Sequence, residues 1–97
     1  MIHRYKRDAA EELFDAIAHY EAERPGLGGE FLDEIDAGLA TIKEAPTRWP
    51  AIEQEVRHYR LHRFPYHIIY QIKYEAISIV AIAHLHRKPG YWRDRLS

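Results

Sequence analysis

The sequence has 97 residues, which is long enough for one hydrophobic core and too short for two, so we expect residues 1–97 to form a single domain. It has no cysteine, no apolar leader and no run long enough to span a membrane, which excludes disulfides and thiolate metal sites and predicts a cytoplasmic protein. The charge is divided, with 6 Lys/Arg against 11 Asp/Glu in residues 1–50 and 8 against 4 in residues 51–97, which predicts a basic surface for an anionic partner or merely solvated charge.

Two amphipathic helices are predicted first. In residues 8–24 the apolar positions recur at three- and four-residue spacing: Ala10, Leu13, Phe14, Ile17, Ala18 and Tyr20. Pro25 and Gly26 end this helix, and a second stripe with the same spacing ends before Pro46: Leu27, Phe31, Leu32, Ile35, Leu39 and Ile42. Because the connection between them is short, we expect the two helices to fold back on each other as an antiparallel hairpin.

The pattern then changes to that of β-strands. Residues 46–55 are predicted to be a loop anchored by Trp49, and three runs rich in β-branched and aromatic residues follow at 56–64, 66–74 and 76–86. Residues 1–5 are a candidate fourth strand. We therefore expect an α+β fold in which the helix hairpin packs on one face of a three- to four-stranded antiparallel sheet.

Alternation along the strands divides their side chains between two faces. Pairing around a turn at Phe64-Pro65 places a polar set on one face: His58, Arg60, His62, His67, Gln71 and Lys73. An apolar set lies on the other face and should receive the helices: Tyr59, Leu61, Ile68, Tyr70 and Ile72. Ile69 is an exception on the polar face, and Ala81 and Ala83 in the last run would let a helix approach closely. We expect the polar set to face solvent or a partner.

The histidines and acidic residues match no established metal or cofactor pattern. His84 and His86 would share a strand face, as would His58 and His62, but no carboxylate accompanies either pair in the sheet and the spacing is not that of a zinc motif. The acidic residues lie mostly on helix surfaces, and the glycines near residue 28 follow a helix, whereas a phosphate-binding loop follows a strand. We therefore expect no metal and no cofactor.

Cations and aromatic rings alternate in the segment 87–95: Arg87, Lys88, Tyr91, Trp92, Arg93 and Arg95. Guanidinium groups can meet phosphates, rings can stack on bases, and histidine together with arginine could cleave RNA without a metal. In the competing interpretation, Tyr91 and Trp92 close the core, and Arg93 and Arg95 pair with helix carboxylates.

Two motifs in the second half carry a resemblance to a known family. The first is RFPYHIIY at residues 63–70, and the second is the apolar run 79–84 followed by HRKPGYWR at residues 86–93. Together with the turn at Gly26 to Gly28, they resemble the RelE/ParE toxins of type II toxin–antitoxin systems over residues 5–95, and the first motif looks most like the ParE-like, plasmid-stabilisation branch. The resemblance implies a bacterial toxin that halts growth and is held inactive by a cognate antitoxin in a hetero-oligomer.

The resemblance also implies one of two targets. RelE-like members cut mRNA in the ribosome, whereas ParE-like members inhibit DNA gyrase and are not nucleases. For a nuclease, the family's positions imply this catalytic set: His58, Arg60, His67, Arg87 and Tyr91. At His67, however, such nucleases usually have arginine, and neutral imidazole offers one donor where guanidinium offers a rigid fork of five.

We therefore favour a ParE-like, non-catalytic inhibitor that binds an essential target, expected to be gyrase. Its expected target-binding residues are cations and aromatics of the sheet face and the C-terminus: Arg60, His62, Arg63, Lys73, Arg87, Lys88, Tyr91, Trp92, Arg93 and Arg95. The alternatives are a ribosome-dependent, metal-independent mRNA endonuclease and a degenerate toxin that only binds its antitoxin. The antitoxin should supply an amphipathic or disordered segment that folds onto the helices or onto the basic face.

Overall fold

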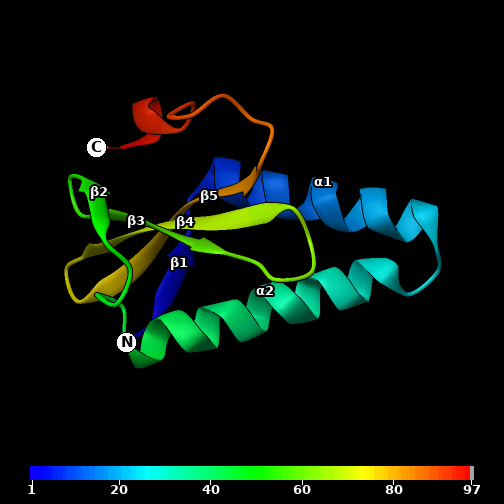
Figure 1. Ribbon diagram of the computed structural model, residues 1–97, viewed down its shortest axis with the longest axis horizontal. Helices are drawn as coiled ribbons and strands as arrows, with labels where there is room; N and C mark the ends of the chain where they lie inside the picture. Colours follow the sequence, from blue (N-terminus) through cyan, green and yellow to red (C-terminus); the bar gives the residue numbers. More distant parts are fainter. Residues whose placement is uncertain (97) are drawn as a thin grey trace.

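The computed structural model describes residues 1–96. The elements follow one another in this order: β1 (His3–Tyr5), α1 (Arg7–Glu23), α2 (Leu27–Glu44), β2 (Ala51–Glu53), β3 (Val56–Arg60), β4 (Tyr66–Lys73), β5 (Ala76–His84) and the 3-10 helix η1 (Arg93–Arg95) (Figure 1). Both helices and the three main strands lie close to their predicted bounds. The exception is the strand expected at 56–64, which ends at Arg60. None of the helices in the described range is both long and apolar enough to cross a membrane.

The sheet has five strands, so the expectation of three to four was wrong. The strand order is β1-β5-β4-β3-β2, in which β1 is parallel to β5 and every other neighbouring pair is antiparallel. The candidate strand at residues 1–5 is therefore present as β1, at one edge. β2 lies at the other edge, within residues predicted to be a loop, and its three residues are too few to show a period of two.

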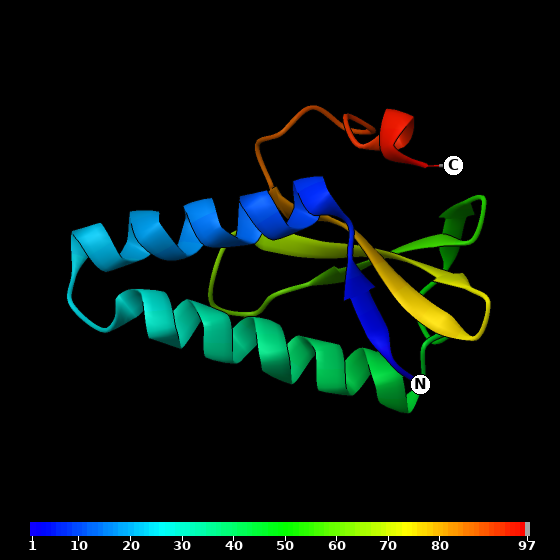
Figure 2. The same ribbon diagram turned by 180° about the vertical axis from the view of Figure 1, so that it is seen from behind.

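The turn between the helices is fixed by one carboxylate. Glu21 of α1 accepts hydrogen bonds from the backbone N–H groups of Gly26, at 3.0 and 3.1 Å, and of Gly28, at 3.0 Å. A Cβ atom at Gly28 would lie 2.6 Å from the backbone oxygen of Ile17, so only glycine permits this approach of the two helices. Figure 2 shows the helices side by side and antiparallel, as their short connection predicted.

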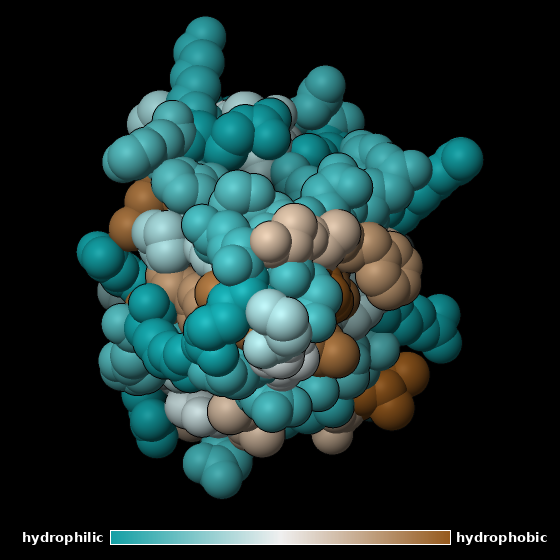
Figure 3. Space-filling view, turned by 90° about the vertical axis from the view of Figure 1, so that its right-hand side faces the viewer, coloured by the Kyte–Doolittle hydropathy of each residue, from teal (hydrophilic) through white to brown (hydrophobic). Residues whose placement is uncertain are grey.

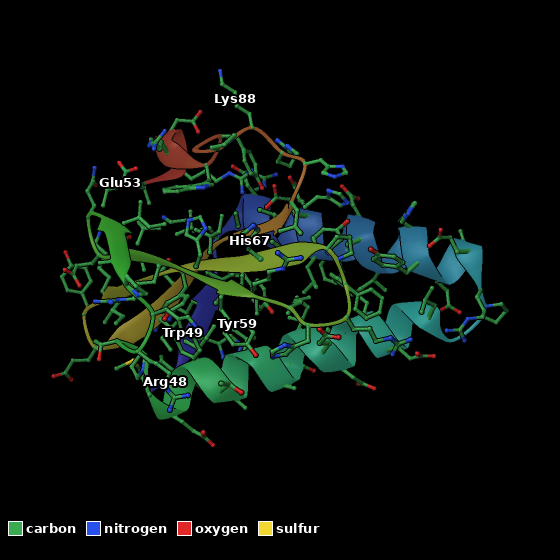
Figure 4. The ribbon with its side chains drawn as sticks, viewed as in Figure 1. Arg48, Trp49, Glu53, Tyr59, His67 and Lys88 are labelled. Carbon is green, nitrogen blue, oxygen red and sulfur yellow. The ribbon has the colours of Figure 1, made fainter. Side chains whose placement is uncertain are left out.

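The larger hydrophobic cluster joins both helices to the sheet. It contains 15 buried residues: Ala9, Leu13, Ala16, Phe31, Ile35, Leu39, Ile42, Tyr59, Leu61, Phe64, Ile68, Tyr70, Ile77, Ile79 and Ile82. An added Cβ at Gly38 of α2 would lie 2.9 Å from the Tyr59 ring, which shows how closely α2 approaches β3. Trp49, the predicted loop anchor, packs edge-on against Tyr59 at 5.1 Å between ring centroids (Figure 4).

The apolar stripe of α1 differs from the predicted one. Ala9, Leu13 and Ala16 are the buried residues of this helix, whereas Phe14 is 67% exposed and Ala18 is also exposed. Successive residues of a helix are about 100° apart around its axis. When positions 9, 13 and 16 face the sheet, position 14 therefore points away from it. The end of the molecule that contains the α1–α2 turn is mostly hydrophilic, with only a few apolar side chains at its surface (Figure 3).

The second face of the sheet carries a smaller cluster. Val56, Ile69, Val80, Ala81 and Ala83 pack there with Trp92 from the chain's last residues. The expectation that Ala81 and Ala83 receive a helix was therefore wrong, since the C-terminal residues lie over them. An irregularity between Ile69 and Tyr70 of β4 also shifts the pairing with β5, so that the neighbours Val80 and Ala81 both join this cluster.

Candidate functional site

The chain beyond β5, residues 85–96, forms what we call the C-terminal segment. It leaves the end of β5 and turns back over the sheet towards β2 (Figures 1 and 2). Backbone hydrogen bonds shape it, among them one from the Arg87 N–H to the His84 carbonyl at 3.0 Å and one from the Tyr91 N–H to the Lys88 carbonyl at 3.1 Å. Trp92 is only 2% exposed, so the core interpretation applies to this ring, which attaches the segment to the sheet.

Two carboxylates of α1 bind the segment from the side: Asp8 Oδ2 lies 3.5 Å from Arg95 Nε, and Glu12 makes most of the contacts. Glu12 accepts a hydrogen bond from the Tyr91 hydroxyl at 2.6 Å and two from the Arg95 guanidinium at 2.8 and 3.0 Å. It also accepts one from the backbone N–H of Ile82 at 3.1 Å, and Arg87 Nη1 lies 3.8 Å away. Burial and the Glu12 hydrogen bond raise the pKa of Tyr91, so its hydroxyl stays protonated. The hydrogen bond to Glu12 likewise raises the pKa of Arg95.

The remaining arginine of the segment pairs elsewhere. Arg93 Nε lies 2.6 Å from a carboxylate oxygen of Glu53, at the end of β2. The interpretation that both arginines pair with helix carboxylates is therefore correct for Arg95 and wrong for Arg93, whose partner comes from a strand that the sequence did not reveal. The two ion pairs therefore connect the segment to α1 through Arg95 and to the edge strand β2 through Arg93.

Two histidines lie under the segment. His58 on β3 and His67 on β4 have ring centroids 5.3 Å apart, and Trp92 lies 5.9 Å from His58. Burial lowers the pKa of both, with His67 as a second cause for His58 and Arg60 as a second cause for His67. The Nε2 atom of His58 is buried without a hydrogen-bond partner in the described part of the chain. Both rings are therefore neutral at pH 7.

A cavity of about 270 Å³ opens between this face and the segment. The sheet contributes His58, His67, Ile69, Ala83 and His84, and β2 contributes Ile52. The segment contributes the other side: Leu85, Arg87, Lys88, Pro89, Gly90, Tyr91, Trp92 and Arg93. We call this cavity the C-terminal pocket. It has cations and imidazoles but no carboxylate among its lining residues.

The structure brings most of the predicted site residues together here. His58, His67, Arg87, Lys88, Tyr91, Trp92 and Arg93 line the C-terminal pocket. Arg60 does not line it but pairs in register with His67 and is exposed beside it. Lys88 points away from the molecule, and His67 lies in the middle of the sheet (Figure 4).

Four predicted residues lie elsewhere. β3 ends at Arg60, so His62 leaves the polar face and contacts the ring of Tyr59 edge-on at 6.5 Å. The backbone N–H of Arg63 donates to Glu34 of α2 at 2.8 Å, and its side chain binds Glu30. Lys73 is at the distant end of β4, near Tyr74. Arg95 is held by Glu12 with 13% of its side chain exposed.

Glu12 is the functional candidate that sequence reasoning missed. An acidic residue in an amphipathic helix is normally solvated, and nothing in the local pattern distinguishes it from Glu11 beside it. Its role depends on contacts with residues about 80 positions later. In residues 1–96, no three His, Asp or Glu side chains lie close enough to one another to hold a metal ion.

Comparisons with known proteins identify the family. Among the solved structures that the chain matches is one described as the chromosomal ParDE TA system from P. aeruginosa, with a TM-score of 0.74 and 22% identity, over 87% of this chain and 95% of that chain. No match was found among curated proteins. The family model described as the ParE toxin of the type II toxin–antitoxin system, parDE, matches residues 4–89. The chain therefore belongs to the ParE toxin family of type II toxin–antitoxin systems.

Proposed function

We propose that this chain inhibits DNA gyrase by binding it, through the C-terminal segment and the adjoining sheet face, and that a cognate antitoxin neutralises it in a hetero-oligomer. Membership of the ParE family supports a toxin with an antitoxin partner. Exposed cations near the pocket, Arg60 and Lys88, have no carboxylate within 4.0 Å in the described residues and are free to meet an acidic surface.

We prefer binding over catalysis because Tyr91 and Arg87, which a nuclease would need, both lie against Glu12. A nuclease would need Arg87 to stabilise a charged phosphorane and Tyr91 to meet the substrate. Here the Tyr91 hydroxyl donates to Glu12, and Arg87 lies over the Tyr91 ring at 3.8 Å and near the same carboxylate. The Tyr91 hydroxyl is thus occupied within the fold, and the half-exposed Arg87 is positioned over its ring, which favours a binding surface.

The mRNA endonuclease remains the second candidate because of one observation. Four of its five implied residues, His58, His67, Arg87 and Tyr91, line the same pocket. A neutral imidazole could accept a proton from a 2′-hydroxyl there. The fifth, Arg60, lies beside the pocket.

Two assays on the purified protein separate the candidates. The first measures supercoiling of relaxed plasmid by gyrase, and the second follows mRNA on translating ribosomes by primer extension. We expect inhibition of supercoiling with intact mRNA. Codon-dependent cuts with unimpaired supercoiling would establish the nuclease, and no effect in either assay would favour a chain that has kept only antitoxin binding.

A pair of charge variants connects the inhibition to this surface. Lys88→Ala removes the cation that projects from the segment, whereas Arg48→Ala removes an exposed cation at the end of α2, on the opposite side of the molecule (Figure 4). We expect Lys88→Ala to raise the concentration needed for half inhibition several-fold, and Arg48→Ala to leave it unchanged. Equal effects would contradict the proposed surface.

A further inference from the structure

Three side chains of the C-terminal segment pack on one another. The guanidinium group of Arg87 lies 3.8 Å from the centroid of the Tyr91 ring, and that of Arg95 lies 5.0 Å from the same centroid. We call these three residues the stack. Arg87 has 53% of its side chain exposed, whereas Arg95 has 13%. Arg87 is therefore the cation of the stack that a partner can reach, and the other two residues support it.

Glu12 of α1 fixes the stack through both of its carboxylate oxygens. Oε1 accepts hydrogen bonds from the Ile82 N–H at 3.1 Å and from Arg95 Nη1 at 2.8 Å. Oε2 accepts from the Tyr91 hydroxyl at 2.6 Å and from Arg95 Nη2 at 3.0 Å, and Arg87 Nη1 lies 3.8 Å from it. Because every partner is a donor, both oxygens have to be acceptors. An amide in this position would turn its NH₂ group towards donors in either orientation.

The remainder of the segment is held independently of Glu12. Trp92 is buried in the second cluster, and Arg93 Nε lies 2.6 Å from a carboxylate oxygen of Glu53. Gly90 has a φ of +77°, and a Cβ atom there would collide with the Arg93 guanidinium, so glycine is required where this arginine crosses the chain. Loss of the Glu12 charge should therefore loosen the stack and leave the segment over the sheet.

We propose that Glu12 is a positioning residue for gyrase inhibition, which holds Tyr91 and Arg95 so that the Arg87 guanidinium meets the target in a fixed orientation. This inference deepens the proposed function and rests on gyrase as the target. A long side chain that is already ordered loses less rotamer freedom when it binds, so the stack lowers the entropic cost of the contact. Glu12 has only 16% of its side chain exposed and acts through Arg87.

The first test is inhibition of gyrase supercoiling by the full-length toxin, with circular dichroism to confirm that each variant is folded. Glu12→Gln should raise the concentration for half inhibition about fivefold, and Arg87→Gln should raise it about tenfold. Glu11→Gln, at an exposed neighbour that pairs with Arg7, should change it by less than about twofold. In the Arg87→Gln chain, adding Glu12→Gln should also change it by less than about twofold, because the group that Glu12 orients is gone.

A second background separates the orientation of Arg87 from detachment of the whole segment. Lys88 projects from the segment and belongs to the proposed target surface (Figure 4). If Glu12→Gln detached the segment, its effect would shrink in the Lys88→Ala chain, because Lys88 would no longer be presented either. If Glu12 acts through Arg87, the effect should persist undiminished in that chain.

A nuclear magnetic resonance signature reports the stack in the absence of gyrase. The ring current of an aromatic side chain shields protons that lie over its face, and the Arg87 guanidinium lies over the Tyr91 ring. The Nε–H and δ protons of Arg87 should therefore resonate upfield of those of the exposed Arg4. Glu12→Gln should move them towards the Arg4 values, and Glu11→Gln should leave them in place.

The outcomes separate this inference from the proposed function. Inhibition by the wild type that Glu12→Gln does not weaken would overturn the inference and leave gyrase as the target. An effect of Glu12→Gln that persists in the Arg87→Gln chain, or that shrinks in the Lys88→Ala chain, would also overturn it. Arg87 resonances that Glu12→Gln does not shift would overturn it whatever the target is. Absence of inhibition by the wild type would overturn both.

Discussion

The two faces of the sheet are held by different kinds of contact. The helix face carries the 15-residue cluster, in which aromatic rings of both helices and the sheet pack together. The opposite face carries six buried residues, and the C-terminal segment is fixed there by Trp92 and by charged groups that bind Glu12 and Glu53. Apolar area sets the stability of the first face, whereas a few specific polar bonds set the geometry of the second.

This difference indicates which substitutions should affect the whole fold and which should act only locally. The segment has no strand pairing and is held by Trp92, by three carboxylates (Asp8, Glu12 and Glu53) and by a hydrogen bond from Arg95 to the Val80 carbonyl. Such a segment can detach while the rest of the fold remains. Substitutions on the helix face should therefore lower global stability, and substitutions under the C-terminal segment should act locally on the surface proposed to bind partners. The following experiments test that division.

The largest effect is expected on the helix face. Phe31 has no exposed surface and contacts the rings of Tyr20, Phe64 and Tyr66 at centroid distances of 5.0 to 5.3 Å. Phe31→Ala should lower the free energy of unfolding by about 3–5 kcal/mol, measured by urea titration with circular dichroism. Phe14→Ala, at the exposed phenylalanine of α1, is the control and should change it by less than about 0.5 kcal/mol. Similar losses in both variants would contradict the assignment of the core.

A smaller effect is expected for the one ring that anchors the C-terminal segment. Trp92→Ala removes a side chain that is almost wholly buried, but the segment can detach instead of leaving a cavity. The cost should be roughly 2–3 kcal/mol, the value of burying one large side chain, without collapse of the helix face. Hydrogen exchange should show faster exchange of amides in residues 85–96 and unchanged protection in α1 and α2. Uniform loss of protection would show that the two faces unfold together.

Glu12 offers a sharper version of the same comparison. Glu12→Gln keeps the shape of the side chain but removes the negative charge of the carboxylate that pairs with Arg95 and accepts a hydrogen bond from the Tyr91 hydroxyl. We expect the free energy of unfolding to fall by roughly 1.5 kcal/mol and tryptic cleavage after Arg87 to become faster. Glu11→Gln, at the exposed neighbour on α1, should leave both unchanged. If Glu11→Gln and Glu12→Gln behave alike, Glu12 does not position the segment.

Local patterns predicted the elements of the fold better than their edges. The helices and the three main strands follow from hydrophobic periodicity, which reports burial against a neighbouring layer. β2 has only three residues, too few for a period, and His62 was misplaced because no local signal marks the end of β3 at Arg60. Phe14 was misplaced because several apolar stripes fit the same helical spacing, and only the packing against the sheet selects one.

The candidate site was predicted only where strand alternation determines it. Adjacent strands bring His58 and His67 together, and period two anticipated this pair. The partners of the arginines depend on how the C-terminal segment crosses the sheet, a path without secondary-structure pattern. Glu12 and Glu53 became the partners through contacts distant in sequence, which composition and spacing cannot specify.

The smallest expected effect is the pH dependence of the histidine pair. Burial lowers the pKa of His58 and of His67 below the value of 6.5 that the unfolded chain is expected to have. At pH values between the folded and the unfolded pKa, the unfolded chain binds more protons than the folded chain does. The stability that the neutral pair contributes is therefore fully present above pH 6.5 and is lost as the pH falls from 6.5 through the folded pKa values. Protonated rings also need solvation, which the position of Trp92 over His58 prevents.

Stability measured from pH 7.5 to 5.5 tests this sign. The double variant His58→Gln, His67→Gln should lose less stability over that interval than the wild type does, and exchange of amides in residues 85–96 should become less sensitive to acid. The exposed His19→Gln on α1 is the control and should keep the wild-type slope. Parallel curves for the double variant and the wild type would mean that the pair under the C-terminal segment titrates as freely as solvated imidazole, and the contrast between the two faces would then rest on Trp92 and Glu12 alone.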